Sequence, residues 1–158
     1  QQVEFGAKVI EIQIDGINFI EHLEYRAFNE GTRLISSVHF AQWLTKTKIK
    51  MVGADAIYAT NKNRTFTSSN QIHTDFVRKG KAGKHEDQRK ILASAIKKER
   101  ATRLEGSFGN EKEHYNLRKI KARTKKSEIL WIFFGIHTAN ALEIGRRIYI
   151  AQSENLAA

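Results

Sequence analysis

Apolar and polar residues alternate near the start of the chain. Isoleucine alternates with a polar residue over 10–14, which is the period of a half-buried strand. Asp15-Gly16 follows, a dipeptide favoured in two-residue hairpin turns. The alternation resumes over 17–25, where apolar and aromatic side chains share one face. The pattern therefore predicts a β-hairpin over 10–25.

Helical spacing replaces this alternation after residue 31. Apolar residues recur every three or four positions over 34–44, and Thr32 is the expected N-cap of a helix that runs to about Thr47. Trp43 lies within this stripe, and so we expect it in the core. Residues 51–55 then read as a short buried strand that ends in Asp55.

The middle of the chain is more polar. A short helix is expected over 65–70 and a short strand over 71–77, followed by a basic, glycine-bearing loop over 78–85. A helical pattern starts at Glu86 and continues to about residue 115. Gly106 and Gly109 interrupt it, each weakening an isolated helix by about 1 kcal/mol relative to alanine. Glycines at these positions indicate close packing or a ligand that approaches the backbone.

The last predicted element is a helix over 129–144 with Ser127 as its N-cap. This stretch is apolar nearly all round, which predicts a buried helix. Trp131 lies within it, and so we expect Trp131 in the core. A membrane span is the alternative, but the apolar run is shorter than the roughly 20 residues that a span needs. The order of strands and helices along the chain predicts a mixed α/β domain with helices packed on a sheet.

The 158 residues suffice for one domain with a core of its own. The absence of cysteine excludes disulfides and thiolate metal sites. The first residues lack the apolar segment of a secretory signal. Because the chain begins at Gln1 rather than Met, we expect a fragment or a processed product.

Positive charge is concentrated in one part of the chain. The net charge is +10, and residues 78–126 hold 17 Lys/Arg against 6 Asp/Glu, whereas the remainder is close to neutral. Such a block favours polyanions through phosphate neutralisation and counterion release. The alternative is a solvated basic face without a specific partner, but such a face gives no reason for the positive charge to be concentrated in one segment. We therefore expect 78–126 to face a nucleic acid.

Two carboxylates are the candidates for chemistry. Asp55 follows an apolar strand, and ligand sites in α/β proteins gather at strand ends. Glu105 lies in the basic segment, and Lys112 follows it by seven residues, which places both on one face of a helix. Carboxylate oxygens suit Mg²⁺, and lysine suits a phosphate. Each residue also has an ordinary explanation, because Asp55 can cap the next helix and Glu105 can belong to a solvated helix face.

Other common sites have no signal in the sequence. The six histidines do not follow the spacing of a metal site, and His137 within an apolar helix is more typical of a core histidine. No phosphate-binding glycine loop and no nucleophile elbow is present.

Two segments resemble the DDE transposases of bacterial insertion sequences. Residues 55–64, Asp-Ala-Ile-Tyr-Ala-Thr-Asn-Lys-Asn-Arg, resemble the second-aspartate region of that family. Residues 103–112, Arg-Leu-Glu-Gly-Ser-Phe-Gly-Asn-Glu-Lys, resemble its glutamate region, with six residues between Glu105 and Lys112 as in the family signature. Residues 4–8 resemble the strand that precedes the hairpin, and the region of Asn140 resembles the last helix, so that the resemblance covers nearly the whole chain.

The resemblance implies a ribonuclease-H-like core lacking its first strand, within the C-terminal part of a transposase catalytic domain. It also implies Mg²⁺-dependent DNA cleavage and strand transfer, with Mn²⁺ as a possible substitute. Asp55 and Glu105 would be the catalytic metal ligands. The expected DNA contacts are Lys112, Arg100, Arg103, Arg64, Lys119 and Arg123. The resemblance also implies that the full-length protein is a homodimer that binds the element ends and target DNA. The implied location is the bacterial cytoplasm, in association with the nucleoid.

Two departures from the family pattern leave an alternative open. The family needs an earlier aspartate, which we expect upstream of this segment, since Asp15 belongs to the hairpin turn. The usual tyrosine and arginine before the glutamate are Lys98 and Ala101 here, with Arg100 and Arg103 nearby. The alternative is a catalytically inactive, DNA-binding transposase remnant. A membrane-associated basic protein using 129–144 is a third interpretation.

Overall fold

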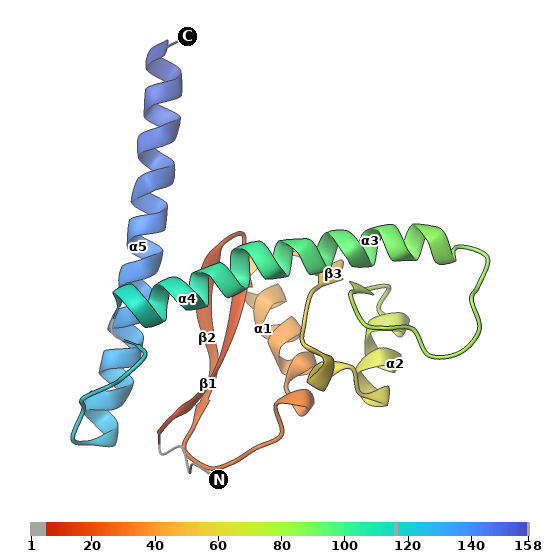
Figure 1. The fold of residues 1–158 in the computed structure, drawn as a ribbon, viewed down its shortest axis with the longest axis horizontal. Coiled ribbons are helices and arrows are strands. Elements are labelled where there is room, and N and C mark those ends of the chain that lie inside the picture. Colours follow the sequence, from red (N-terminus) through yellow and green to blue (C-terminus); the bar gives the residue numbers. More distant parts are fainter. Residues whose placement is uncertain (1–5, 116, 158) are drawn as a thin grey trace. The chain divides into compact units, whose positions relative to one another are not determined.

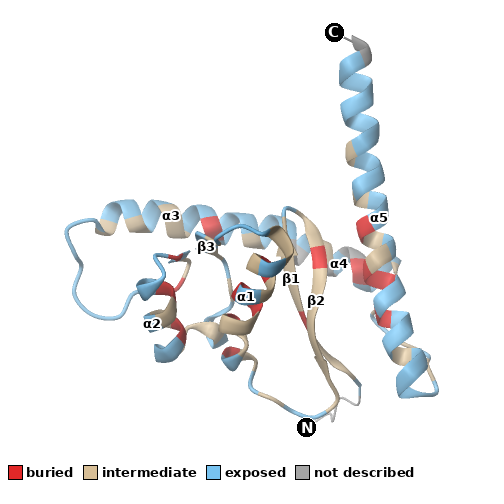
Figure 2. Ribbon diagram, turned by 180° about the vertical axis from the view of Figure 1, so that it is seen from behind, coloured by how far each residue is buried: buried red, intermediate tan, exposed pale blue. Residues whose placement is uncertain are grey.

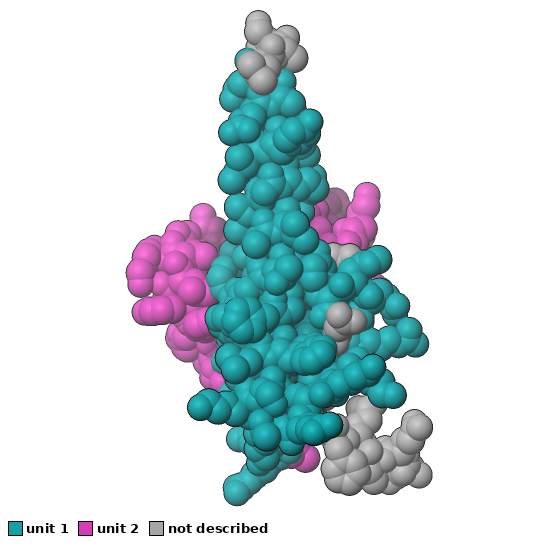
Figure 3. All heavy atoms as spheres, turned by 90° about the vertical axis from the view of Figure 1, so that its left-hand side faces the viewer, with its two compact units in different colours: residues 1–26, 106–158 teal, residues 27–105 magenta. Residues whose placement is uncertain are grey.

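The computed structural model describes residues 6–115 and 117–157 and shows a mixed α/β protein (Figure 1). The chain forms two compact units, which Figure 3 distinguishes by colour. Residues 1–26 and 106–158 form the first, here called the hairpin unit, and residues 27–105 form the second, the parallel-strand unit. Each has its own two-stranded sheet. Glu4 and Phe5, which contribute to the family resemblance, lie outside the described residues.

The hairpin unit begins with the predicted β-hairpin. Strands β1 (Lys8–Ile14) and β2 (Ile17–Glu24) pair antiparallel, with Ile14 opposite Ile17. Asp15 and Gly16 have φ angles of 47° and 75°, and this left-handed conformation at both central positions matches the twist of the strands. The hairpin prediction is confirmed.

Helix α5 (Lys125–Ala157) packs against β2 and is longer than predicted. Its buried positions are Ile132, Gly135, Ile136 and Asn140, which recur at helical spacing and form a narrow stripe. Figure 2 shows that most of the remaining helix is exposed. The prediction of a helix buried all round is therefore wrong, and Trp131 is 36% exposed.

The start of α5 also differs from the prediction. The N–H of Ser127 donates to Thr124 Oγ1 at 3.2 Å, and the N–H of Thr124 donates to Ser127 Oγ at 3.2 Å. Thr124 is thus the N-cap of α5. Ser127 is the third residue of the helix, and its side chain caps in return by accepting from the N–H of Thr124. Within residues 6–115 and 117–157, no helix combines the length and hydropathy that crossing a membrane requires, which contradicts the membrane-span alternative for 129–144.

The parallel-strand unit holds the second sheet. Strand β3 (Met51–Val52) pairs parallel with β4 (His73–Thr74). A parallel pair needs a crossover connection, and α2 (Asn61–Ser69) lies in it. The other elements of this unit are η1 (Glu30–Thr32), α1 (Leu34–Thr45), η2 (Ala56–Tyr58), α3 (Glu86–Glu99) and η3 (Arg100–Leu104). Its apolar core includes Leu34, Val38, Ile72, Phe76 and Ile96.

Several local predictions for this unit need correction. Thr32 ends η1 and does not cap α1, whose first flanking residue is Arg33. Trp43 is 62% exposed, because it lies on the outer face of α1 and stacks on Phe40 instead of entering the core. Met51 is 58% exposed, so β3 is not a buried strand. The side chain of Thr60 caps α2, which starts earlier than expected.

The long helical stretch from Glu86 contains three segments. Helix α3 is followed by the π-helix η3, and α4 (Glu105–His114) follows. π-helical turns are rare and occur frequently at functional sites. The space around Gly106 and Gly109 is open, because a Cβ at either position would meet nothing within 4 Å. Close packing therefore does not explain these glycines.

Candidate functional site

Asp55 is positioned by the end of β3. It follows Val52 by three residues and immediately precedes η2, with an extended backbone. Its backbone carbonyl accepts from the N–H of Tyr58 at 2.9 Å, but its side chain makes no capping hydrogen bond. The carboxylate is 71% exposed. Capping of the next helix, the ordinary explanation for Asp55, is thus contradicted.

Arg100 joins Asp55 to a second aspartate. Its Nη1 donates to Asp55 Oδ1, and its Nε lies 3.3 Å from Asp75 Oδ2. Asp75 directly follows β4 and is 5% exposed, and its Oδ1 accepts from the N–H of Ala54 at 3.1 Å. Because β3 and β4 are parallel, both aspartates follow strands whose carboxyl ends meet at the same edge.

Gly53 makes this arrangement possible. A Cβ at residue 53 would lie 2.9 Å from Ile96 Cγ2 and 3.6 Å from Arg100 Cβ. Only glycine lets α3 approach the end of β3 this closely. Asp75 was not among the residues predicted for the site, because it lies inside the strand predicted over 71–77, whereas in the structure β4 ends at Thr74 and Asp75 directly follows it.

Glu105 is the first residue of α4, and its side chain lies outside the described residues. Lys112 belongs to the same helix, as predicted from the sequence, and is exposed. Lys119 and Arg123 are exposed in the connection between α4 and α5 and form no ion pair with another described residue.

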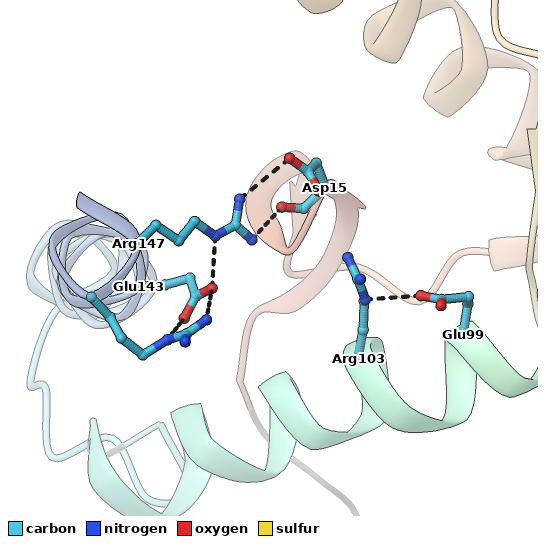
Figure 4. Close-up of polar contacts among 6 residues, drawn as sticks. Asp15, Glu99, Arg103, Glu143 and Arg147 are labelled. Atoms are coloured by element: carbon cyan, nitrogen blue, oxygen red, sulfur yellow. Dashed lines mark hydrogen bonds and ion pairs between the residues drawn. The ribbon is translucent and has the colours of Figure 1, made fainter. Parts of the chain in front are cut away.

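Besides Arg100, two more of the predicted DNA contacts have partners within the protein. Arg103 forms an ion pair with Glu99 at 2.8 Å, one turn earlier in the helix (Figure 4). Arg64 donates from Nε to the carbonyl of Ala59 at 2.9 Å, and its guanidinium lies 5.5 Å from the ring centre of Phe76. The Arg64 contacts fix the segment after Asp55.

Ion pairs organise the beginning of the basic segment. Glu86 binds Arg89 at 2.6 Å and Arg78 at 2.8 Å. These two guanidiniums, Arg89 foremost, lower the pKa of Glu86 to about 2. The basic loop over 78–85 is thereby tied to the first turn of α3. In the part of the chain that the structure describes, no group of three or more carboxylates and histidines gathers as a metal site.

The hairpin unit contains an acid pair, formed by the buried Glu111 and the half-buried Glu11, that the sequence did not indicate. Glu11 of β1 and Glu111 of α4 form a hydrogen bond, and Asn18 Nδ2 donates to Glu111 Oε1 at 2.5 Å. Burial, followed by the nearby Glu111 carboxylate, raises the pKa of Glu11 to about 8. Burial also raises the pKa of Glu111. The pair therefore retains a proton near neutral pH.

The tip of the hairpin is held by α5. Arg147 donates from Nη2 to the carbonyl of Asp15 at 2.6 Å, and its Nη1 lies 3.3 Å from Asp15 Oδ2 (Figure 4). Glu143 orients Arg147 through a 2.8 Å contact to Nε. Asp15 thus serves the turn, as the sequence predicts. No family model, curated protein or solved structure matches this chain.

Proposed function

We propose that this chain is the C-terminal part of the catalytic domain of a DDE transposase, acting in Mg²⁺-dependent DNA cleavage and strand transfer. The observation that carries the proposal is Asp55, an exposed carboxylate that follows one strand of a parallel pair and does not cap the adjacent helix. A ribonuclease-H-like core, with its first strand supplied from outside this segment, is the finer fold assignment that goes with this proposal.

The residues of this chain suit a hard cation only in part. Asp55 offers exposed carboxylate oxygens, the ligands that Mg²⁺ prefers, and Glu105 is the second proposed ligand. Bound Mg²⁺ would stabilise the entering and leaving oxygens of the phosphodiester. The earlier aspartate is still required, and Asp15 does not supply it, because it lies in the hairpin turn beside Arg147.

Helix α4 supports DNA as the substrate. Gly106 and Gly109 leave its backbone open, and Lys112 is exposed on the same helix. Backbone without side chains lets a phosphate approach closely, and lysine then neutralises it. Lys119 and Arg123 would extend the DNA contact beyond the end of α4, while Arg100 and Arg103 would contribute next to Glu105.

A catalytically inactive DNA-binding remnant is the second candidate function. The observation that favours it is the ion pair between Arg100 and Asp55, which neutralises the proposed metal ligand. Both candidates require DNA binding by the basic segment, but only the first requires cleavage.

Two measurements test the proposals. Binding of the 158-residue chain to duplex DNA should weaken steeply as salt increases, because several phosphates are neutralised. A flat salt response would contradict both candidates. We expect no Mg²⁺-dependent nicking by this chain alone, since a required aspartate is missing. Nicking that disappears in Glu105→Gln would show that the chain is catalytically sufficient.

A further inference from the structure

One face of α5 is exposed along most of the helix. It lies opposite the buried stripe, the side on which α5 packs against β2, and Figure 2 shows how much of the helix is exposed. Trp131, Phe134 and Ile148 belong to this face, with exposed fractions of 36%, 63% and 53%. We call it the heptad face. Its eight positions, all exposed, are Ser127, Trp131, Phe134, Thr138, Ala141, Gly145, Ile148 and Gln152.

The spacing of the heptad face is that of a coiled coil. Its members lie alternately four and three residues apart from 127 to 152, which is the repeat by which one helix packs along another. None of the eight residues is charged, whereas a helix face that stays in water normally carries charged side chains. The heptad face therefore fits the uncharged face of a second helix.

The two halves of the heptad face complement each other when two copies run antiparallel. A Cβ at Gly145 would meet nothing within 4 Å, so the ring of Phe134 from a second copy has room to lie against this backbone. In a parallel pair, Gly145 would face Gly145 and leave a gap, which close-packed interfaces avoid. The antiparallel register that places Phe134 opposite Gly145 also pairs Trp131 with Ile148, Thr138 with Ala141 and Ser127 with Gln152.

A hollow beside the first half of the heptad face has room for side chains from the second half. Its volume is about 490 Å³. In the antiparallel register, Ile148 and Tyr149 of the second copy would enter it, and Tyr149 is 73% exposed. A tyrosine suits this position because its ring packs on apolar side chains while its hydroxyl stays in water. The walls of the hollow include His114, Tyr115, Leu130, Trp131, Phe134 and Thr138.

Charge favours the same direction. Lys125 and Lys126 lie in the first turn of α5 and Glu154 lies near its end, and all three are exposed. An antiparallel pair brings the glutamate of each copy towards the lysines of the other, whereas a parallel pair brings like charges together. The positive N-terminal end of one helix dipole then also lies beside the negative C-terminal end of the other.

We infer that the heptad face is a self-association surface and that its occupant is a second copy of this chain, bound as an antiparallel α5–α5 pair. Self-complementary pairing is what a two-fold dimer requires, because the same surface serves both copies. The inference does not rest on the proposed function, since neither DNA nor a metal ion takes part in the contact.

Sedimentation equilibrium of the 158-residue chain, from about 1 to 100 µM, is the first test. We expect a concentration-dependent dimer. Gly145→Glu places a charge against Phe134 of the other copy and should weaken dimerisation by about tenfold or more, while the open surroundings of Gly145 let the single chain fold, as circular dichroism can verify. Ser153→Glu adds the same charge at an exposed position outside the heptad face and should change the dimer affinity by less than about twofold.

A compensating pair of substitutions tests the register. Phe134→Ala should weaken the dimer by about tenfold, because it removes the ring that fills the space at Gly145. Gly145→Leu alone should also weaken it through overpacking. The double variant should dimerise more tightly than either single variant, because the leucine then fills the space that the ring has left.

The direction of the pair can be measured because the chain contains no cysteine. A spin label on Ser153→Cys, which points away from the heptad face, should give a distance of about 40 Å between the two copies by double electron–electron resonance, from the register and a rise of about 1.5 Å per residue. A parallel pair would give less than about 20 Å.

Four results would overturn the inference. They are a chain that stays monomeric at every concentration, equal effects of Gly145→Glu and Ser153→Glu, a short distance between the labels, and a double variant no tighter than its parents. A monomer that instead binds anionic lipid vesicles would assign the heptad face to a lipid surface. A dimer that behaves as expected while the intact gene product neither binds nor cleaves DNA would leave this inference standing and remove the proposed function.

Discussion

Asn140 of α5 pairs with the backbone of Asn18 in β2 as a neighbouring strand would. Its Oδ1 accepts from the N–H of Asn18 at 2.9 Å, and its Nδ2 donates to the carbonyl of Asn18 at 2.7 Å. Both residues are buried, with Asn18 1% and Asn140 8% exposed. One side-chain amide thus satisfies both polar groups of a buried residue's backbone and joins the hairpin to the helix.

Replacement of Asn140 should therefore destabilise the hairpin unit strongly. Asn140→Ala leaves a buried N–H and a buried carbonyl without partners, and we expect a loss of about 2–4 kcal/mol in the free energy of unfolding. Urea denaturation measures this loss. Asn155→Ala, at an exposed position of the same helix, is the control and should cost less than about 0.5 kcal/mol. Equal effects of the two variants would contradict the pairing.

The Glu11–Glu111 pair predicts a pH-dependent stability. The folded-state pKa of Glu11, about 8, lies above its ordinary value of 4.5, so the folded protein holds a proton that the unfolded chain has released. Its contribution is complete below about pH 4.5 and is lost as the pH rises towards 8. We expect the free energy of unfolding to fall between about pH 5 and pH 8.

Glu11→Gln isolates this effect, because glutamine keeps a hydrogen-bonding group and does not titrate. The variant should show a flatter pH profile than the wild type in urea denaturation series. Glu113→Gln changes an exposed carboxylate on α4 and should leave the profile unchanged. A wild-type stability that rises over the same pH range, or a Glu11→Gln profile as steep as the wild type, would count against the shared proton.

Substitution of Gly109 should change the stability and the DNA affinity in opposite directions. In Gly109→Ala the new methyl group meets nothing within 4 Å, and alanine favours the helix, so we expect a gain of up to about 1 kcal/mol in stability. The methyl group would also block close approach of a phosphate to α4, and the affinity for DNA should fall. Thermal melting and a DNA titration by fluorescence anisotropy measure the two effects. Unchanged DNA affinity would remove α4 from the interface.

Gly31→Ala provides the contrasting case in the parallel-strand unit. A Cβ at residue 31 would lie 2.5 Å from the carbonyl oxygen of Ile57, and a backbone atom cannot move aside easily. We expect destabilisation by about 1–3 kcal/mol in denaturant unfolding. A neutral outcome would show that η1 and η2 are not closely packed.

The connection between α4 and α5 should contribute directly to DNA affinity. Lys119→Gln and Arg123→Gln each remove one exposed charge. Each substitution should leave one fewer phosphate neutralised and so reduce the slope of log K against log salt by about 0.9. Lys48→Gln removes an exposed charge outside 78–126 and should leave the slope unchanged. If all three variants behave alike, DNA affinity depends on the net charge of the whole protein and not on residues 78–126.

Local signals in the sequence predicted the hairpin and the location of several helices, but not the helix caps at Thr32 and Ser127. The hairpin follows from a two-residue period and Asp15-Gly16, since both signals depend on neighbouring residues. The helix from Glu86 and the location of Asp55 after a strand were also predicted. The apolar run of 129–144 predicted a buried helix, and this prediction was wrong. Hydropathy alone does not reveal how many faces of a helix pack against other elements.

Contacts between distant residues could not be predicted. Glu11 and Glu111 lie far apart in the sequence, and no local pattern relates them. The parallel pairing of β3 with β4 brings Asp75 to the same edge as Asp55, but strands of two residues carry little periodicity. Arg100 was predicted to contact DNA, and its position against Asp55 depends on Gly53 and on the π-helix that begins at residue 100.

Cleavage by the intact gene product tests the central claim most directly. The complete reading frame that contains this chain should be expressed and assayed for Mg²⁺-dependent nicking of supercoiled DNA, with Asp55→Asn, Glu105→Gln and the control Glu113→Gln. We predict nicking by the wild type and the control, and a decrease of about a hundredfold or more in the Asp55 and Glu105 variants. Nicking that survives both substitutions, or the absence of Mg²⁺-dependent nicking by the wild type, would contradict the assignment.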